Sequence, residues 1–176
     1  VNAAVLYSKL LQYCNGAVYN EEGKYVEIHN NKLDALEDIL NNYPDENILV
    51  AFKFKSDEDR IRKRFKYAVT INSKNVDKVK KQWNDGKIKL LLCQSSSAKG
   101  LNIQYGGRII VWFGIEIDAE NYLQVNSRLH RYGQTKPVIL HHLCMESSID
   151  ARVVEVLEGK INIQEALLSD LKFALI

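Results

Sequence analysis

The sequence predicts a doubly wound α/β domain, with a mainly parallel sheet and helices on both of its faces. Three apolar runs of strand length, residues 48–54, 88–93 and 108–113, carry this prediction together with the helical segments that separate them. Strands covered on both faces are apolar throughout, and parallel neighbours need crossover helices between them. The alternation of the two kinds of segment therefore predicts a parallel sheet.

Ahead of the sheet, the sequence predicts a helix and a short hairpin. Apolar residues recur at helical spacing over residues 3–13, and Gly16 and Gly23 punctuate two short extended pieces that can pair. We expect residues 1–30 to form an amino-terminal appendage and residues 31–176 to form the main domain.

Helices and strands then alternate to the end of the chain. The expected elements are a helix over 33–42, a strand over 48–54, a helix over 56–64, a strand over 67–71, a helix around 76–83, strands over 88–93 and 108–113, a helix from 118 to 132, a strand over 138–145, and helices over 147–159 and 162–173. Pro44 stops the first of these helices. Ser56, with Asp59 three residues later, is a capping signal for the second, and Asp118 is the expected cap of the fourth.

The arginine segment, residues 124–134, is the strongest candidate for a functional site. On a helix, Gln124, Arg128 and Arg131 share one narrow face, and a separate apolar stripe that includes Leu129 is free to pack. Two arginines on a helix closed by Gly133 suit a polyphosphate, because guanidinium groups keep their charge and their forked donors match phosphate oxygens. A solvated basic face is the alternative interpretation of this spacing.

A second candidate is the serine loop, residues 95–102, which follows the strand at 88–93. It holds small and hydroxyl residues together with one lysine and one amide: Ser95, Ser96, Ser97, Ala98, Lys99, Gly100 and Asn102. Such residues let backbone N–H groups approach phosphates closely, although a helix cap with a tight turn has the same composition. Ligands of open α/β sheets gather beyond the carboxyl ends of the strands, so we expect this loop and the arginine segment to face the same edge.

Composition limits the class of protein without identifying it. The 176 residues, 46% of them hydrophobic, can bury one substantial core, and the formal charge of +2 does not by itself indicate nucleic acid. No apolar run is long enough to span a membrane, and no membrane partner is expected. Three widely spaced cysteines lack metal-ligand spacing, which predicts reduced thiols in an intracellular protein and no metal site: Cys14, Cys93 and Cys144.

Both candidate segments resemble motifs of one family. The pattern Gln-x-x-x-Arg-x-His-Arg-x-Gly-Gln-Thr-Lys from Gln124 to Lys136 resembles motif six of the Swi/Snf-like branch of superfamily-two helicases and translocases, with Ser127 where Gly is usual. The serine loop resembles motif five, which ends in Gly-Leu-Asn, with polar residues in place of the usual Ala-Gly-Gly. Residues 9–15, and residues 32–36 followed by 48–52, resemble the stretches that precede motif four, so the resemblance spans most of the chain.

The resemblance implies the second RecA-like domain of a two-domain motor, in a divergent subfamily of phage or bacterial type. It also implies ATP and Mg²⁺ in the cleft between the two domains of one polypeptide, held mainly by the first domain. The sequence itself has no Gly-x-x-x-x-Gly-Lys-Ser/Thr loop and no strand that ends in paired acidic residues. Because these parts are missing, we expect the chain to be inactive as an ATPase alone. Its first residue, Val1 instead of Met, indicates part of a longer protein.

The resemblance further implies roles for individual residues. Arg128 and Arg131 would be arginine fingers, and Gln124 and Gly100 would help to place the nucleotide. The residues expected to contact the backbone of DNA, with RNA as an open alternative, are Ser95, Ser96, Ser97, Lys99 and Asn102.

Two other functions stay open. The same basic residues can serve a nucleic-acid-binding module that only grips phosphates. A Rossmann-type domain for a small molecule is the third class, and the lack of Gly-x-Gly-x-x-Gly after a strand argues against it.

Overall fold

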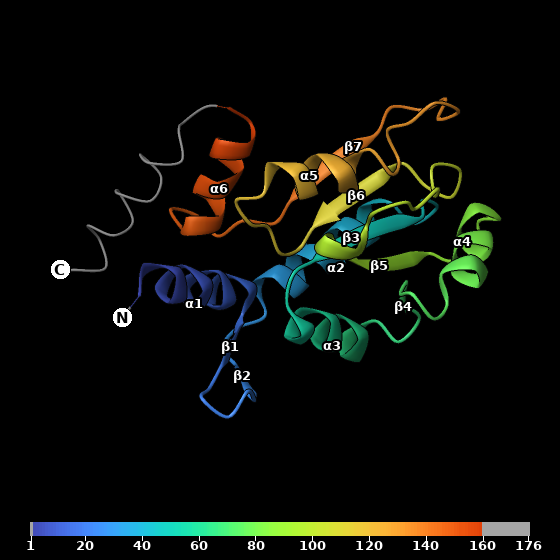
Figure 1. Cartoon of the computed structure of the whole chain (residues 1–176). Helices are drawn as coiled ribbons and strands as arrows, with labels where there is room; N and C mark the ends of the chain where they lie inside the picture. Colours follow the sequence, from blue (N-terminus) through green and yellow to red (C-terminus); the bar gives the residue numbers. More distant parts are fainter. Residues whose placement is uncertain (1, 160–176) are drawn as a thin grey trace.

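Parallel strands form the central sheet in the computed structural model of the chain, which describes residues 2–159 (Figure 1). The strand order is β4-β5-β3-β6-β7, and each neighbouring pair is parallel. The bounds are β3 Ile48–Phe52, β4 Val69–Thr70, β5 Leu90–Gln94, β6 Ile109–Trp112 and β7 Ile139–His142. This confirms the predicted parallel α/β fold, although several strands are shorter than their apolar runs.

Helices cover both faces of the sheet. The helices are α1 Ala3–Asn15, α2 Asn31–Asn42, α3 Lys55–Arg64, α4 Val76–Asn84, α5 Ala119–Asn126 and α6 Ile149–Leu157, and residues Ser95–Ser97 form a single 3-10 turn, η1. Two short strands, β1 Ala17–Tyr19 and β2 Tyr25–Glu27, pair as an antiparallel hairpin. The helix predicted over 162–173 lies outside the described residues.

The side chains of β3 alternate between two hydrophobic clusters, one on each face of the sheet. Leu49 and Ala51 join the cluster that α4, α5 and α6 cover, whereas Ile48, Val50 and Phe52 join the cluster that α2 and α3 cover. This alternation follows from the period of two in a strand. Burial on both faces explains why the whole run is apolar.

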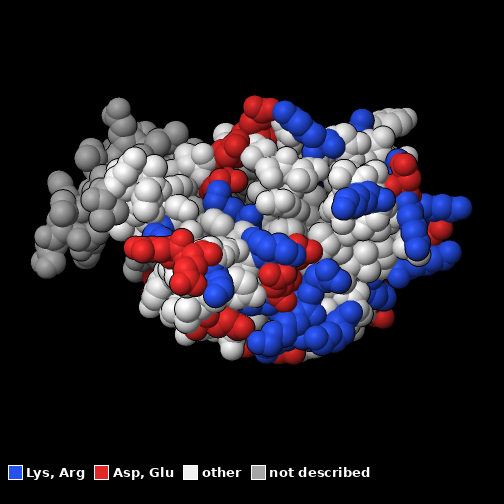
Figure 2. All heavy atoms as spheres, turned by 60° about the horizontal axis from the view of Figure 1, so that its bottom comes forward, with Lys and Arg blue, Asp and Glu red and all other residues white. Residues whose placement is uncertain are grey.

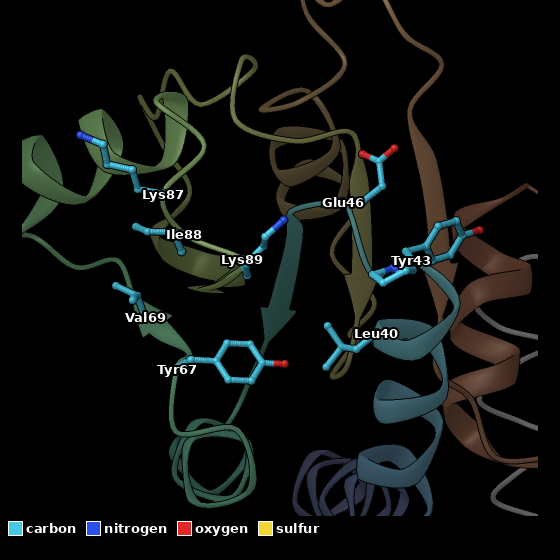
Figure 3. A pocket seen from close by; sticks show the side chains of 9 residues that line it. Leu40, Tyr43, Glu46, Tyr67, Val69, Lys87, Ile88 and Lys89 are labelled. Atoms are coloured by element: carbon cyan, nitrogen blue, oxygen red, sulfur yellow. The ribbon is translucent and has the colours of Figure 1, made fainter.

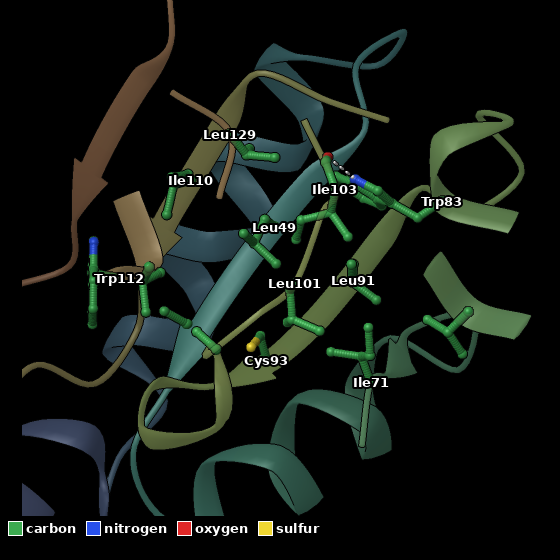
Figure 4. Packing of buried hydrophobic residues seen from close by; sticks show 14 of the residues in the cluster. Leu49, Ile71, Trp83, Leu91, Cys93, Leu101, Ile103, Ile110, Trp112 and Leu129 are labelled. Atoms are coloured by element: carbon green, nitrogen blue, oxygen red, sulfur yellow. Dashed lines mark hydrogen bonds between the residues drawn. The ribbon is translucent and has the colours of Figure 1, made fainter. Parts of the chain in front are cut away.

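Trp83 anchors one end of the first cluster (Figure 4). Its side chain is fully buried, and its indole N–H donates to the backbone oxygen of Ile103 at 2.8 Å. The ring lies so close to the backbone at Gly106 that a Cβ there would be 2.3 Å from Trp83 Cδ1. Only glycine fits at this position, which fixes the path of the chain as it enters β6.

A buried polar network of Asn15, Lys32, Asp57 and Asp150 joins α1, α2, α3 and α6. Lys32 Nζ lies 2.7 Å from Asp150 Oδ2, with the two side chains 3% and 1% exposed. The same ammonium donates to Asn15 Oδ1 at 2.8 Å and to the backbone oxygen of Phe113 at 3.0 Å. Asn15 Nδ2 in turn donates to Asp57 Oδ2 at 3.0 Å.

Asp57 caps α3, which corrects the predicted cap at Ser56 and Asp59. The helix begins at Lys55, and Asp57 Oδ2 accepts from the backbone N–H of Phe54 at 2.9 Å. Burial raises the pKa of Asp57 from 3.8 to about 6, against the opposing effects of the Phe54 N–H and the Lys32 charge. A Cβ at Gly114 would lie 2.7 Å from Asn15 Nδ2 and 3.0 Å from Asp57 Oδ2, so glycine allows the chain after β6 to pass close to this pair.

The first thirty residues contact the main domain through buried groups. Arg60 of α3 is 1% exposed and donates to the backbone oxygen of Asn15 at 2.6 Å and to Asn30 Oδ1 at 3.1 Å. A small cluster of Leu11, Cys14 and Ile149 packs α1 against α6. The domain boundary at residue 30 stays a prediction.

No helix in the described part of the chain is long and apolar enough to cross a membrane.

The Lys32–Asp150 pair yields a prediction about stability. Lys32→Met leaves the Asp150 carboxylate buried without its cation, so we expect the unfolding free energy to fall by roughly 3–5 kcal/mol in urea titrations. The double variant Lys32→Met/Asp150→Asn should lose clearly less than the sum of the single losses. Lys24→Met is the matched control, because its ion pair with Glu22 is exposed. A loss no larger than that of the control would contradict a structural role for the buried pair.

Candidate functional site

The arginine segment is not a continuous helix, which corrects the prediction of a helix to residue 132. α5 begins at the predicted cap, Asp118, whose side chain accepts from Asn121 N at 2.9 Å, and it ends at Asn126. Two side-chain donors then converge on the carbonyl of Gln124: Ser127 Oγ at 2.8 Å and Arg128 Nε at 2.9 Å. Side chains that bond to nearby carbonyls compete with the helical ladder, and residues 127–133 consequently form turns.

The turns after α5 still place both arginines against the serine loop. Arg128 is partly buried, and its guanidinium donates to the backbone oxygen of Leu101 at 3.3 Å. Arg131 is exposed and donates to Asn102 Oδ1. Leu129, between them, is fully buried in the first hydrophobic cluster and fixes the turn to the core. The expected meeting of the two candidate segments is therefore observed.

The acceptors that hold the two arginines are uncharged. Arg128 contacts backbone carbonyls and Arg131 contacts an amide oxygen, and within residues 2–159 the structure gives neither guanidinium a carboxylate partner. Two positive charges thus lie at this surface without compensation, which suits an incoming anion.

The residues of the serine loop differ in exposure. Ser95 is buried, whereas Ser96, Ser97, Lys99 and Asn102 are exposed. Gly100 has a left-handed φ of 75° with nothing near its missing side chain, so it turns the loop without a close approach to other atoms.

Glu120 connects two of the predicted site residues and was missed by the sequence reasoning. Gln124 Nε2 donates to Glu120 Oε1 at 2.7 Å, and Lys99 Nζ lies 3.7 Å from the same oxygen. Both members of the Lys99–Glu120 pair are about three-quarters exposed, with 76% and 75% of their side-chain surface accessible. Exposed pairs of this kind contribute little stability, so Lys99 stays available to a phosphate.

A cavity of about 590 Å³, the carboxyl-edge cavity, opens beside the serine loop where β3, β4 and β5 end. Ser97 and Lys99 line it together with residues that the sequence reasoning missed: Lys55, Thr70, Asn72 and Ser73. Each of the missed residues ends or follows a strand at the same edge, which is the signal that could have found them. Lysine and arginine side chains are numerous on this side of the molecule, with Asp and Glu side chains among them (Figure 2).

Another cavity, of about 380 Å³, lies between the end of α2 and the beginning of β5 (Figure 3). Its walls carry Leu40, Tyr43, Tyr67, Val69, Ile88 and Lys89. None of the predicted site residues lines it, so it plays no part in the site described above.

Comparison with known proteins gives consistent matches over most of the chain. Residues 31–133 match the family described as the helicase conserved C-terminal domain. Protein p41 of Acyrthosiphon pisum secondary endosymbiont phage 1 is 36% identical over 98% of this chain. Chromodomain-helicase-DNA-binding protein 6 of Rattus norvegicus is 26% identical over 79% of it. The chain spans only 38% of the length of the first relative and 5% of the second.

Among solved structures, the C-terminal part of the Fun30 ATPase domain has a similar fold. The TM-score is 0.62, at 19% sequence identity, and the match covers 78% of this chain and 50% of that one. At this identity the likeness supports the fold alone.

Leu129 of the arginine segment and Leu123 of α5 provide a test of how the turn packs against the core. Leu129→Ala removes a fully buried side chain, so we expect the unfolding free energy to fall by about 2–5 kcal/mol. Leu123→Ala changes the same atoms at a position that is 65% exposed, and its effect should stay within about 0.5 kcal/mol. Chemical denaturation of both variants measures the difference, and equal losses would contradict the described packing of the turn.

Proposed function

Because the chain belongs to the family of the helicase conserved C-terminal domain, and to its Swi/Snf-like members, we propose that it is the second motor domain of an ATP-dependent DNA helicase or translocase. The contact of Arg128 and Arg131 with Leu101 and Asn102 is the observation that supports this most directly. This contact joins two arginines that have no carboxylate partner to the serine loop, which borders the carboxyl-edge cavity. The arginines and the loop together can thus bind a nucleotide phosphate and a nucleic-acid backbone.

Arg128 and Arg131 are proposed to act on the phosphates of ATP. A guanidinium that faces the transferring phosphoryl group stabilises the charge that develops there. Their neutral partners support this role, since a phosphate would displace only a carbonyl or an amide oxygen. We expect Gln124 and Gly100 to help place the nucleotide, with the Gln124 amide released from Glu120 on binding.

The first motor domain of the same polypeptide would hold most of the nucleotide. The 176 residues contain no phosphate-binding loop of the Gly-x-x-x-x-Gly-Lys-Ser/Thr type. That domain would also hold Mg²⁺, which would supply positive charge to the phosphates. This chain alone is therefore expected to hydrolyse no ATP.

The carboxyl-edge cavity and the serine loop are proposed to contact the nucleic-acid backbone. Exposed hydroxyl and amide groups at Ser96, Ser97 and Asn102 can donate to phosphates, and Lys99 adds a charge at the rim. Ser95 is buried, so its contribution would come through the position of the loop. The second candidate function is a module that binds nucleic acid without ATP turnover. The carboxyl-edge cavity favours it as well, because its polar and basic lining can contact phosphates without ATP.

The role of Arg131 is tested in the full-length parent protein. If its charge meets the phosphoryl group mainly in the transition state, Arg131→Ala should lower ATP turnover about a thousand-fold, equivalent to roughly 4 kcal/mol of barrier, while nucleotide binding changes little. Arg131→Lys should not restore turnover, because an ammonium lacks the planar fork. Arg62→Ala, at an exposed position on α3, is the control. Near-parental turnover in Arg131→Ala would instead favour the binding module.

The role of Lys99 is tested by titrating the chain with DNA at several salt concentrations. Loss of one phosphate contact in Lys99→Gln should weaken binding and reduce the slope of log K against log salt by roughly 1. Lys24→Gln removes an equally exposed lysine from the hairpin and should leave the slope unchanged. An unchanged slope in Lys99→Gln would remove this residue from the proposed contact surface.

A further inference from the structure

The outer side of α4 presents a group of lysines, the α4 lysine face, formed by Lys74, Lys78 and Lys81. Lys74 lies in the turn that precedes the helix, and the other two lie on the helix. All three residues are exposed. Because a helix turns by about 100° per residue, Lys78 and Lys81 point away from the side that buries Val79 and Trp83. α4 therefore packs through its apolar side and offers positive charge on the other.

The lysines of this face have no acidic side chain to neutralise them. Asp77 is the only acidic residue of the helix, and it pairs with Lys80 at 3.5 Å. Within residues 2–159 the structure gives none of the three lysines an ion pair. Residues 72–84 contain four lysines and one aspartate, a formal charge of +3, whereas the whole chain carries +2. The rest of the chain is thus slightly acidic in sum, and positive charge is concentrated at α4.

The α4 lysine face continues directly from the carboxyl-edge cavity. Asn72 and Ser73 line that cavity, and Lys74 is the next residue of the chain. Lys99 of the serine loop lines the same cavity. Because β4 ends at Thr70, α4 starts at the carboxyl edge of the sheet and leads away from it. A polyanion bound in the cavity can therefore reach the lysines of α4 without leaving the surface.

The composition of this face fits the backbone of a duplex better than a single strand or a membrane. Single strands bind to aromatic rings on which their bases stack, and the one aromatic residue of α4, Trp83, is fully buried. An amphipathic helix binds a lipid surface through exposed apolar side chains, but the apolar side of α4 is packed in the first hydrophobic cluster. Lysines without exposed rings or apolar neighbours favour duplex phosphates as the ligand.

On the basis of the proposed function, which assigns nucleic acid to the carboxyl-edge cavity, we propose that the α4 lysine face binds phosphates of duplex DNA beside that cavity. This contact is additional to those of the cavity and the serine loop. Lysine ammonium groups meet phosphates as point charges, so the contact supplies affinity without sequence preference. Each lysine that neutralises a phosphate releases counterions, which makes the contact sensitive to salt.

The first experiment titrates the whole chain with a short duplex DNA at several salt concentrations. The triple variant Lys74→Gln/Lys78→Gln/Lys81→Gln should bind at least about tenfold more weakly at low salt. It should also reduce the slope of log K against log salt by roughly 2–3, since each lost phosphate contact removes about 0.9. An unchanged slope in this variant, or no binding of duplex DNA by the parental chain, would overturn the proposal.

A second triple variant removes the same charge elsewhere. Lys24→Gln/Lys89→Gln/Lys136→Gln changes three exposed lysines that do not line the carboxyl-edge cavity, and the slope should stay close to that of the parental chain. Equal losses in the two triple variants would show that only net charge matters and would contradict a contact at α4. All six positions are exposed, so thermal unfolding of both variants should match the parental chain, which excludes loss of fold as the cause.

Two other polyanions identify the ligand of the face. A single strand of the same sequence should lose less affinity in the α4 triple variant than the duplex loses. Vesicles that contain an anionic phospholipid should show no binding that depends on these lysines. Equal losses for duplex and single strand, or vesicle binding that the α4 triple variant abolishes, would contradict duplex DNA as the ligand.

The Lys99→Gln variant separates this contact from the proposed function. If Lys99→Gln reduces the slope and the α4 triple variant does not, DNA contacts the serine loop alone and the proposed role of α4 is wrong. If the α4 triple variant reduces the slope and Lys99→Gln does not, α4 binds DNA and the proposed contact of the serine loop is wrong. ATP turnover in Arg131→Ala is measured independently of both.

Discussion

The burial of Lys32 beside Asp150 constrains how the rest of the domain is assembled. A buried charge is tolerated only when its partners are all in place, and the partners of Lys32 come from α1, α6 and the end of β6. Asn15 carries the constraint on to Asp57, which fixes the start of α3 and the chain that leaves β3. Residues far apart in the sequence thus set the carboxyl edge of the sheet, and the proposed site is built on that edge.

The architecture was predictable because its signals are local. β3, β5 and β6 are apolar at every buried position, and Asp118 caps α5 as its sequence context indicates. The start of α3 was misplaced because Asp57 and Asp59 have the same chemistry, and only the buried contact with Asn15 distinguishes them. The end of α5 was also misplaced, since the competition of Ser127 and Arg128 for one carbonyl depends on rotamers that no spacing pattern reveals.

The candidate site was predictable in its main parts and not in its details. Because ligand sites of open α/β sheets lie beyond the carboxyl ends of the strands, the arginine segment was expected to face the same edge as the serine loop. The structure shows the two segments in contact. Glu120 could not be assigned in advance, because it is ordinary for its helix and acquires a place near the site only through folding.

The bonds of Arg128 have a mechanical consequence. Its guanidinium donates to a main-chain oxygen in α5 and to another in the serine loop. Main-chain atoms cannot swing away as side chains do, so the arginine acts as a cross-brace between two stretches of backbone. A phosphate that displaced both oxygens would therefore undo the brace and release the serine loop from α5, whereas Leu129 would keep the turn anchored in the core.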